Sequence, residues 1–130
     1  MAGTLTISTL SDGTYTTSST NLVRGACQAW VNFNGVTTTS IRASYNVSSV
    51  TFVSTGNYTV NFTNALTDAN YCITAATTGS YGANWGIINV NITGSGATEV
   101  APTTSAFAVE IVQPSTARID SKYVYLACFR

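Results

Sequence analysis

The sequence predicts an all-β protein, an antiparallel β-sandwich with jelly-roll-like organisation. Helical periodicity is weak along the chain, and segments rich in Thr, Val, Ile, Tyr and Phe alternate between apolar and polar residues. Gly and Asn turns separate about eight or nine such segments, at the spacing of an antiparallel sandwich. A length of 130 residues fits one domain with a sizeable core.

The N-terminal part of the chain is expected to form an arm. Residues 4–10 alternate as a short strand, and residues 11–21 are polar and broken by an Asp-Gly turn. We therefore divide the chain into an N-terminal strand and polar arm, residues 1–21, and a β-sandwich domain, residues 22–130. The arm is expected to lie on a neighbouring surface.

The opening strand of the sandwich is expected over residues 24–33 and ends at an Asn-Gly turn. Alternation places Val31 and Phe33 on a core face and Trp30 on the opposite face. A tryptophan there predicts that the second face meets something other than water: a second sheet, another subunit or a ligand. A covering loop of the same chain is the ordinary alternative.

The next strand is expected over residues 37–47, with Ile41, Ala43 and Tyr45 on one face and Arg42 on the other. Strands at 49–53 and 58–63 then form the clearest hairpin. Its tight turn is expected to centre on Gly56-Asn57, because glycine takes a positive φ readily at the first central position. Residues 71–77 form the following strand.

The C-terminal half adds three strands, which are expected at 87–93, 105–113 and 121–130. Residues 78–86 are expected to form a loop rich in Gly and aromatics, residues 94–104 a flexible connection, and residues 114–120 a turn. Glu110 is expected to point outward from its strand. Both faces of the last strand are apolar, so that strand is expected to be buried on two sides.

Composition favours an assembled protein. Charged residues make up 8% of the chain and the net charge is zero, and sparse charge is typical of surfaces that become buried between subunits. The alternative is a neutral, Thr-rich sandwich that works alone. The chain has five Lys or Arg residues and no basic run, so it lacks the positively charged patch expected of a nucleic-acid-binding protein. No apolar stretch approaches the ~20 residues that span a bilayer, so we expect no membrane insertion.

Catalysis and cofactors are not expected. Histidine is absent, which removes the usual general base and the commonest metal ligand. The acids are few, and Asp12 and Asp68 sit in turn sequences that explain them locally. Cys27, Cys72 and Cys128 are far apart with no CxxC pair, so we expect three small buried hydrophobes. A disulfide is the alternative, which a reducing cytosol disfavours.

Several segments resemble a known group. "AWVNFNG", "IRASYNVSSVT" and "GNYTVNFTNALTDANY", with the ending "YVYLACFR", resemble a β-domain in virion proteins of tailed bacteriophages and prophages, often at the distal end of tail fibres. The resemblance covers roughly residues 24–77, with a weaker part at the C-terminus. Residues 78–122 match less well, as expected of loops that vary with the partner.

The resemblance implies a non-enzymatic virion structural protein, tail-fibre-like and commonly a homotrimer, for assembly and host-surface attachment. The implied partners are copies of itself, other phage structural proteins and a host cell-surface glycan. The N-terminus has no basic and apolar regions of a secretory signal, so we expect synthesis in the host bacterial cytoplasm and localisation on the virion.

Two positions on the virion stay open, because we expect no long fibre shaft before the domain. The chain is expected to be a small fibre or tail-tip protein. The alternative is a capsid decoration or cement protein on the phage head. In that case the arm, residues 1–21, would lie across neighbouring subunits and add strands to exposed edges.

Two groups of residues are candidates for contact. We expect Trp30, Arg42, Tyr123 and Tyr125 at a subunit interface. Arg42 either pairs across that interface, with Asp68 or the C-terminal carboxylate, or is solvated at a sheet edge.

A second candidate contact lies in the loop "TGSYGANWG". Its Tyr81, Asn84 and Trp85 offer flat aromatic surface and amide hydrogen bonds, which suit sugar rings, so we expect them to contact a receptor. The alternative is a loop that packs its aromatic side chains inward.

Overall fold

The computed structural model describes residues 3, 6–78, 86–93, 98–114 and 117–130. Within these residues the regular structure is mostly β-strand, with one short helix. In chain order the elements are β1 Thr9–Ser11, β2 Thr16–Ser18, α1 Ser19–Gly25, β3 Cys27–Asn34, β4 Ser40–Tyr45, β5 Val47–Ser54, β6 Asn57–Phe62, β7 Cys72–Thr77, β8 Ile87–Val90, β9 Ile92–Thr93, β10 Thr98–Glu99, β11 Ala106–Val112 and β12 Val124–Phe129.

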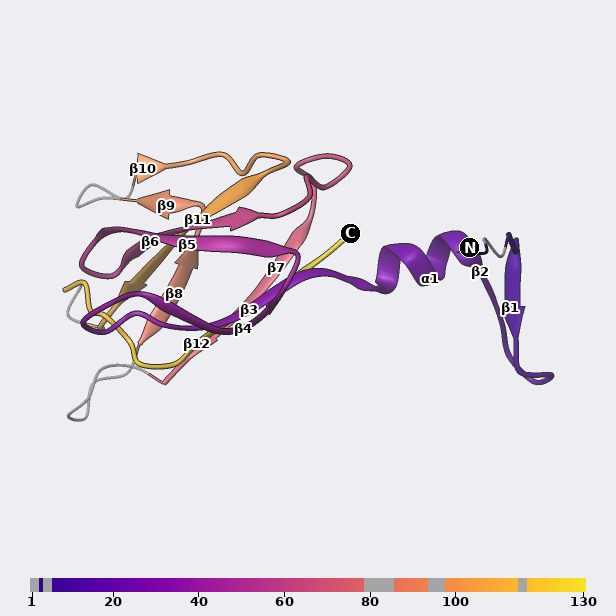
Figure 1. The fold of residues 1–130 in the computed structure, drawn as a ribbon, viewed down its shortest axis with the longest axis horizontal. Helices are drawn as coiled ribbons and strands as arrows, with labels where there is room; N and C mark the ends of the chain where they lie inside the picture. The colour runs from indigo at the N-terminus through magenta and orange to yellow at the C-terminus, as the bar shows by residue number, and fades with distance from the viewer. Residues whose placement is uncertain (1–2, 4–5, 79–85, 94–97, 115–116) are drawn as a thin grey trace.

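Two four-stranded antiparallel sheets form the body of the protein (Figure 1). The first sheet has the order β4-β3-β12-β7, and the second has the order β5-β6-β11-β8. Apolar side chains from both sheets form one buried cluster between them. The predicted all-β sandwich of antiparallel sheets is confirmed.

The core follows from period-two alternation along the strands. In the first sheet Val31 of β3 lies opposite Leu126 of β12, and in the second Val60 of β6 lies opposite Phe107 of β11. All four side chains point between the sheets and are buried. The buried apolar residues are Ala29, Val31, Phe33, Val47, Tyr58, Val60, Phe62, Leu66, Tyr71, Phe107, Ala108, Val109, Ile111, Ile119, Val124, Leu126 and Cys128.

Tyr58 joins the two sheets at one end of the core. Its ring packs edge-on against Phe33 with 5.2 Å between centroids, and its hydroxyl donates to Asp120 Oδ1 at 2.5 Å. Burial raises the pKa of Tyr58 above its ordinary value, and the Asp120 carboxylate raises it further. Gly35 leaves room for this hydroxyl, because a Cβ there would collide with Tyr58 Oη.

The chain passes from the first sheet to the second at Asn46. This residue has a φ of 54°, a left-handed conformation that asparagine tolerates better than most residues. Its side chain donates to Gln28 O and Asn64 O, both at 3.1 Å, and accepts from Asn64 N at 2.8 Å. Asn46 therefore fixes the corner between β4 and β5.

The predicted hairpin forms, but its turn lies one residue earlier than expected. Ser54 pairs with Asn57, so the two central residues are Thr55 and Gly56. Gly56 has the expected positive φ, 71°, although it takes the second central position. Gly56 N donates to Asp120 Oδ1 at 2.8 Å, which ties the turn to the segment before β12.

The strand predicted over residues 87–93 forms as two strands. The backbone bends at Asn91, which has a φ of 59°, and this bend separates β8 from β9. β8 stays in the second sheet, while β9 pairs with β10 in a separate two-stranded sheet.

The N-terminal segment extends away from the sandwich (Figure 1). β1 and β2 form a hairpin whose turn is held by Asp12, because Asp12 Oδ1 accepts from Thr14 N and Tyr15 N. These bonds lower the pKa of Asp12. α1 follows, with Ser18 as its N-cap. The sequence pattern did not predict this helix, which spans the boundary placed after residue 21 and shortens the opening strand to Cys27–Asn34.

No helix in the described part of the chain is long and apolar enough to span a membrane.

Candidate functional site

The outer face of the first sheet carries large aromatic side chains. Trp30 of β3 is paired with Tyr45 of β4 on one side and with Ala127 of β12 on the other. These side chains face away from the core, because the neighbouring Val31 points into it. We call this surface the aromatic face and define it by Trp30, Asn32, Arg42, Tyr45, Tyr123, Tyr125 and Ala127.

The aromatic face is open. The exposed fractions are 40% for Trp30, 58% for Tyr45, 37% for Tyr123 and 42% for Tyr125. Within a single chain the last strand is not buried on both sides as expected: the side that carries Leu126 is buried, and the tyrosine side is exposed. A second layer that covers those tyrosines is not present within the described residues.

The second sheet presents a contrasting outer face. Asn61 donates from Nδ2 to Ser49 Oγ and to Thr51 Oγ1, both at 3.0 Å, and Thr59 lies next to Thr51 across the strands. These small polar side chains satisfy one another and suit contact with water. The second sheet also exposes Phe52, Val53 and Ile87. Among the described residues, however, it is the first sheet that gathers Trp30, Tyr45 and Tyr125 on its outer face, where their burial would yield a large hydrophobic gain.

A β-bulge sets the positions on β4. The pairing of β3 with β4 shifts between Asn32 and Phe33, so Ile41 lies opposite Phe33 and points inward, while Ala43 lies opposite Asn32 and points outward. The predicted grouping of Ile41, Ala43 and Tyr45 on one face is wrong, because alternation is interrupted at the bulge.

The bulge places Arg42 on the aromatic face. Its guanidinium carbon lies 4.3 Å from the centroid of the Tyr123 ring, a cation–π contact. Arg42 Nη1 also donates to Asn32 Oδ1 at 3.4 Å. Lys122 Nζ lies 5.9 Å from the same ring. The Tyr123 and Tyr125 rings are parallel within 8°, with 6.5 Å between centroids.

The four predicted interface residues therefore lie on one face, although they come from three separate strand regions. Trp30, Arg42, Tyr123 and Tyr125 are all part of the aromatic face. Tyr45 was missed, because its orientation depends on the bulge. The predicted receptor residues Tyr81, Asn84 and Trp85 lie outside the described residues.

Asp68, one considered partner of Arg42, is engaged elsewhere. Arg130 forms an ion pair with it and donates from Nε to Asp68 Oδ1 at 2.8 Å. The same oxygen accepts from Asn70 N at 2.8 Å, as an Asp in a turn often does. Asp68 therefore anchors the end of β12 to the loop before β7.

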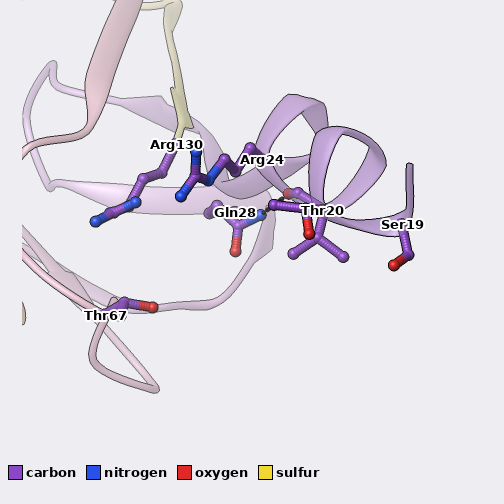
Figure 2. Close-up of a pocket in the computed structure, with 7 residues that line it drawn as sticks. Ser19, Thr20, Arg24, Gln28, Thr67 and Arg130 are labelled. Carbon is purple, nitrogen blue, oxygen red and sulfur yellow. Dashed lines mark hydrogen bonds between the residues drawn. The ribbon is translucent and has the colours of Figure 1, made fainter. Parts of the chain in front are cut away.

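A shallow groove of about 430 Å³ lies where α1 meets the sandwich (Figure 2). Gln28 Nε2 donates to Val23 O at 2.9 Å and to Ala26 O at 3.1 Å, which holds the end of α1 against β3. The side chains around the groove come from α1, β3, the loop after β6 and the C-terminus: Ser19, Thr20, Val23, Arg24, Gln28, Thr67 and Arg130. None of them is an acid or a nucleophile paired with a base.

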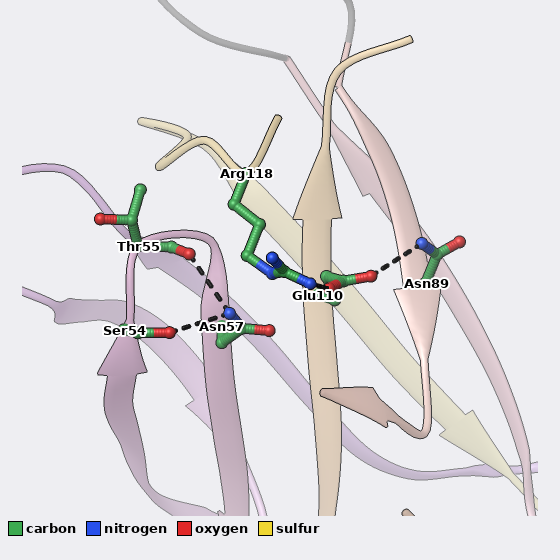
Figure 3. A network of polar contacts seen from close by, with 6 residues as sticks. All are labelled: Ser54, Thr55, Asn57, Asn89, Glu110 and Arg118. Atoms are coloured by element: carbon green, nitrogen blue, oxygen red, sulfur yellow. Dashed lines mark hydrogen bonds and ion pairs between the residues drawn. The ribbon is translucent and has the colours of Figure 1, made fainter. Parts of the chain in front are cut away.

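Glu110 is buried, which corrects the expectation that it points outward to solvent. Its Oε1 lies 2.6 Å from Arg118 Nη2, and the two side chains are 5% and 23% exposed. Asn89 Nδ2 donates to Glu110 Oε2 at 3.2 Å (Figure 3). The alternation on β11 is as predicted, but the segment after β11 folds back and carries Arg118 over the carboxylate, beside Asn57.

Asp120 and Asp12 are also tied to structural partners. Asp120 accepts from Tyr58 and Gly56, and Asp12 accepts from backbone N–H groups. No group of three His, Cys, Asp or Glu side chains in the described part of the chain could hold a metal ion.

The three cysteines are free thiols in different settings. Cys128 is buried in the core, and burial raises the pKa of its thiol to about 12. Cys27 is half-buried. Cys72 is exposed at the start of β7, so the expectation of three buried cysteines is wrong for this residue.

Comparison with known proteins gives no match to a family model, to a curated protein sequence or to a solved structure. The geometry of the chain itself therefore carries the functional argument. The aromatic face can bury apolar area against a partner and stack on flat rings, and Arg42 and Lys122 can pair with an acidic side chain of that partner.

Proposed function

We propose that this chain is a non-enzymatic structural protein of a phage virion, most like a tail-fibre domain, and that it assembles through the aromatic face. The observation that carries the proposal is the exposure of Trp30, Tyr45, Tyr123 and Tyr125 together on one sheet, with Arg42 as the cation among them. Only 8% of the residues are charged, so little charge repulsion would keep such an apolar surface from associating with other molecules in water.

The size of the face fits a subunit contact. With about 200 Å² for each aromatic side chain, the exposed fractions leave roughly 350 Å² of aromatic surface on each copy. A stable interface buries about 800 Å² per partner, so the aromatic face would form the apolar centre of such a contact, and its rim would be polar. The proposal includes a homotrimer, which the sequence resemblance implies, and a jelly-roll organisation of the strands.

The alternative is a capsid decoration or cement protein. The arm favours it, because a hairpin and helix that extend away from the sandwich could reach across neighbouring subunits (Figure 1). Attachment to a host glycan through Tyr81, Asn84 and Trp85 remains a prediction.

Sedimentation equilibrium of the purified chain tests the assembly. We expect a trimer at micromolar concentration, and a monodisperse monomer would refute the proposal. Electron microscopy with gold-labelled antibodies against the chain, on particles from the encoding phage or prophage, tests the location. Label at the tail supports the fibre function, whereas label on the head shell supports the decoration alternative.

A further inference from the structure

In the structure the N-terminal arm extends through α1, beyond the boundary predicted after residue 21, so from here on the arm means residues 6–25. This segment has no core of its own. None of the seven residues of α1 is buried, and the two strands of the hairpin have three residues each. The arm nevertheless exposes five large apolar side chains, 38–77% exposed: Ile7, Leu10, Tyr15, Leu22 and Val23. Helices this short and isolated two-stranded hairpins are marginal in water. A stable arm therefore needs a surface to pack on.

The sandwich of the same chain does not supply this surface within the described residues. The hairpin lies beyond the far end of α1, away from both sheets (Figure 1). The contact between arm and sandwich is at the last turn of α1, where Gln28 holds Val23 O and Ala26 O. These two bonds fix the direction in which the arm leaves β3.

The aromatic face has a place for apolar side chains of the arm. A shallow hollow of about 170 Å³ lies between β7 and β12, where Thr74, Ala76 and Ala127 are small and Tyr125 forms a wall. An aliphatic side chain that enters it would contact the Tyr125 ring on one side and the two alanine methyl groups on the other.

Charge also favours the arm over a second aromatic face. The face carries Arg42, with Lys122 beside Tyr123, and none of its defining residues is acidic. A second copy of the face would add only the same cations. The arm carries two charged side chains at opposite ends: Asp12 at the tip of its hairpin, next to Tyr15, and Arg24 in the last turn of α1. Only the hairpin tip therefore complements Arg42 and Lys122, and this pairing would fix the orientation of the arm.

We propose that the arm of one copy packs on the aromatic face of a second copy, with Leu22 and Val23 against the aromatic side chains and Asp12 toward Arg42 and Lys122. The inference rests on the proposed self-assembly and names the occupant of the same face. Arm-to-face contact is heterologous, so the geometry between successive copies decides whether a closed ring, such as a trimer, forms.

Complementation between two variants tests this contact in the full-length chain. The arm variant is Leu22→Ser/Val23→Ser, and the face variant is Trp30→Ala. The matched control is Phe52→Ala, an exposed aromatic on the second sheet. The arm variant alters no buried side chain, so its fold should persist. Each variant alone is expected to associate at least ~30-fold more weakly than wild type, from about 2 kcal/mol of lost apolar burial.

Native mass spectrometry of the two variants mixed gives the decisive result. The mixture is expected to form heterodimers with one intact contact, because the face variant keeps an intact arm and the arm variant keeps an intact face. Amide hydrogens of residues 9–25 are expected to exchange slowly only in the assembled wild type. Failure of the mixture to associate would overturn the arm-to-face contact.

The arm proposal and the function proposal fail separately. If the arm variant assembles as wild type does while Trp30→Ala does not, the arm proposal is overturned and assembly through the face stands. If Trp30→Ala assembles normally while the arm variant does not, the aromatic face is not the binding surface and both proposals are overturned. The same holds if neither variant weakens assembly.

Discussion

Replacement of Trp30 by alanine is the most direct test of the aromatic face. A tryptophan side chain buries up to about 250 Å², and 40% of Trp30 is exposed in the single chain, so about 100 Å² remains for a partner to cover. At about 25 cal/mol per Å² this area contributes about 2.5 kcal/mol for each covered Trp30. The dissociation constant is therefore expected to rise roughly 70-fold per covered Trp30.

Sedimentation velocity across a concentration series measures this shift, at a temperature where circular dichroism shows the variant to be folded. The melting temperature is expected to fall as well, because the buried part of Trp30 packs within its own sheet. Phe52→Ala removes a side chain of similar exposure, 49%, from the other sheet and should leave association unchanged. A dissociation constant for Trp30→Ala within twofold of wild type would refute the reasoning, as would equal weakening by the control.

Three further changes test the sandwich itself. Arg118→Met should lower the free energy of unfolding in urea by about 3–5 kcal/mol, because it leaves the Glu110 carboxylate buried without its cation. The double variant with Glu110→Gln should recover most of this loss. A double variant no more stable than Arg118→Met would contradict the buried ion pair. Gly56→Ala should cost about 2–4 kcal/mol by thermal melting, since φ is 71° and a Cβ would lie 2.6 Å from Ile111 O; an unchanged melting temperature would argue against the turn. The pKa of the Cys128 thiol is raised by burial from its ordinary 9.0 to about 12, so the stability it contributes is complete below pH 9 and is lost progressively as pH rises toward 12, because the unfolded thiol ionises first. Urea midpoints at pH 8 and pH 9.5 should show a larger decrease for wild type than for Cys128→Ala, and equal decreases would contradict this.

Local pattern was sufficient for most of the fold. Alternation of apolar residues located β3 to β9, β11 and β12, although β8 and β9 were predicted as one strand and β10 was expected to be part of a flexible connection. It placed Val31, Phe33 and Val109 in the core, because side-chain direction along a strand has a period of two. It failed where the period is broken. The bulge opposite Asn32 reversed the expected sides on β4, and the bend at Asn91 divided one predicted strand into two.

The helix α1 was missed for a different reason. Its seven residues include Ser, Thr and Asn, which have modest helix propensity, and none of its side chains is buried. A helix without an apolar face toward a core leaves no periodic signal in the sequence. Its Ser18 N-cap is the one local feature that could have indicated its start.

By itself, the sequence determined that Trp30, Tyr123 and Tyr125 are large aromatic side chains on strand faces of a chain with few charges, where contact with water would be unfavourable. Only the tertiary structure decided that they share one open face with Arg42 and Tyr45, and that Glu110 is covered. The physical reason is that composition and alternation are local properties of a strand. Neighbours across a sheet depend on strand order, register and bulges, which arise only when distant segments pair.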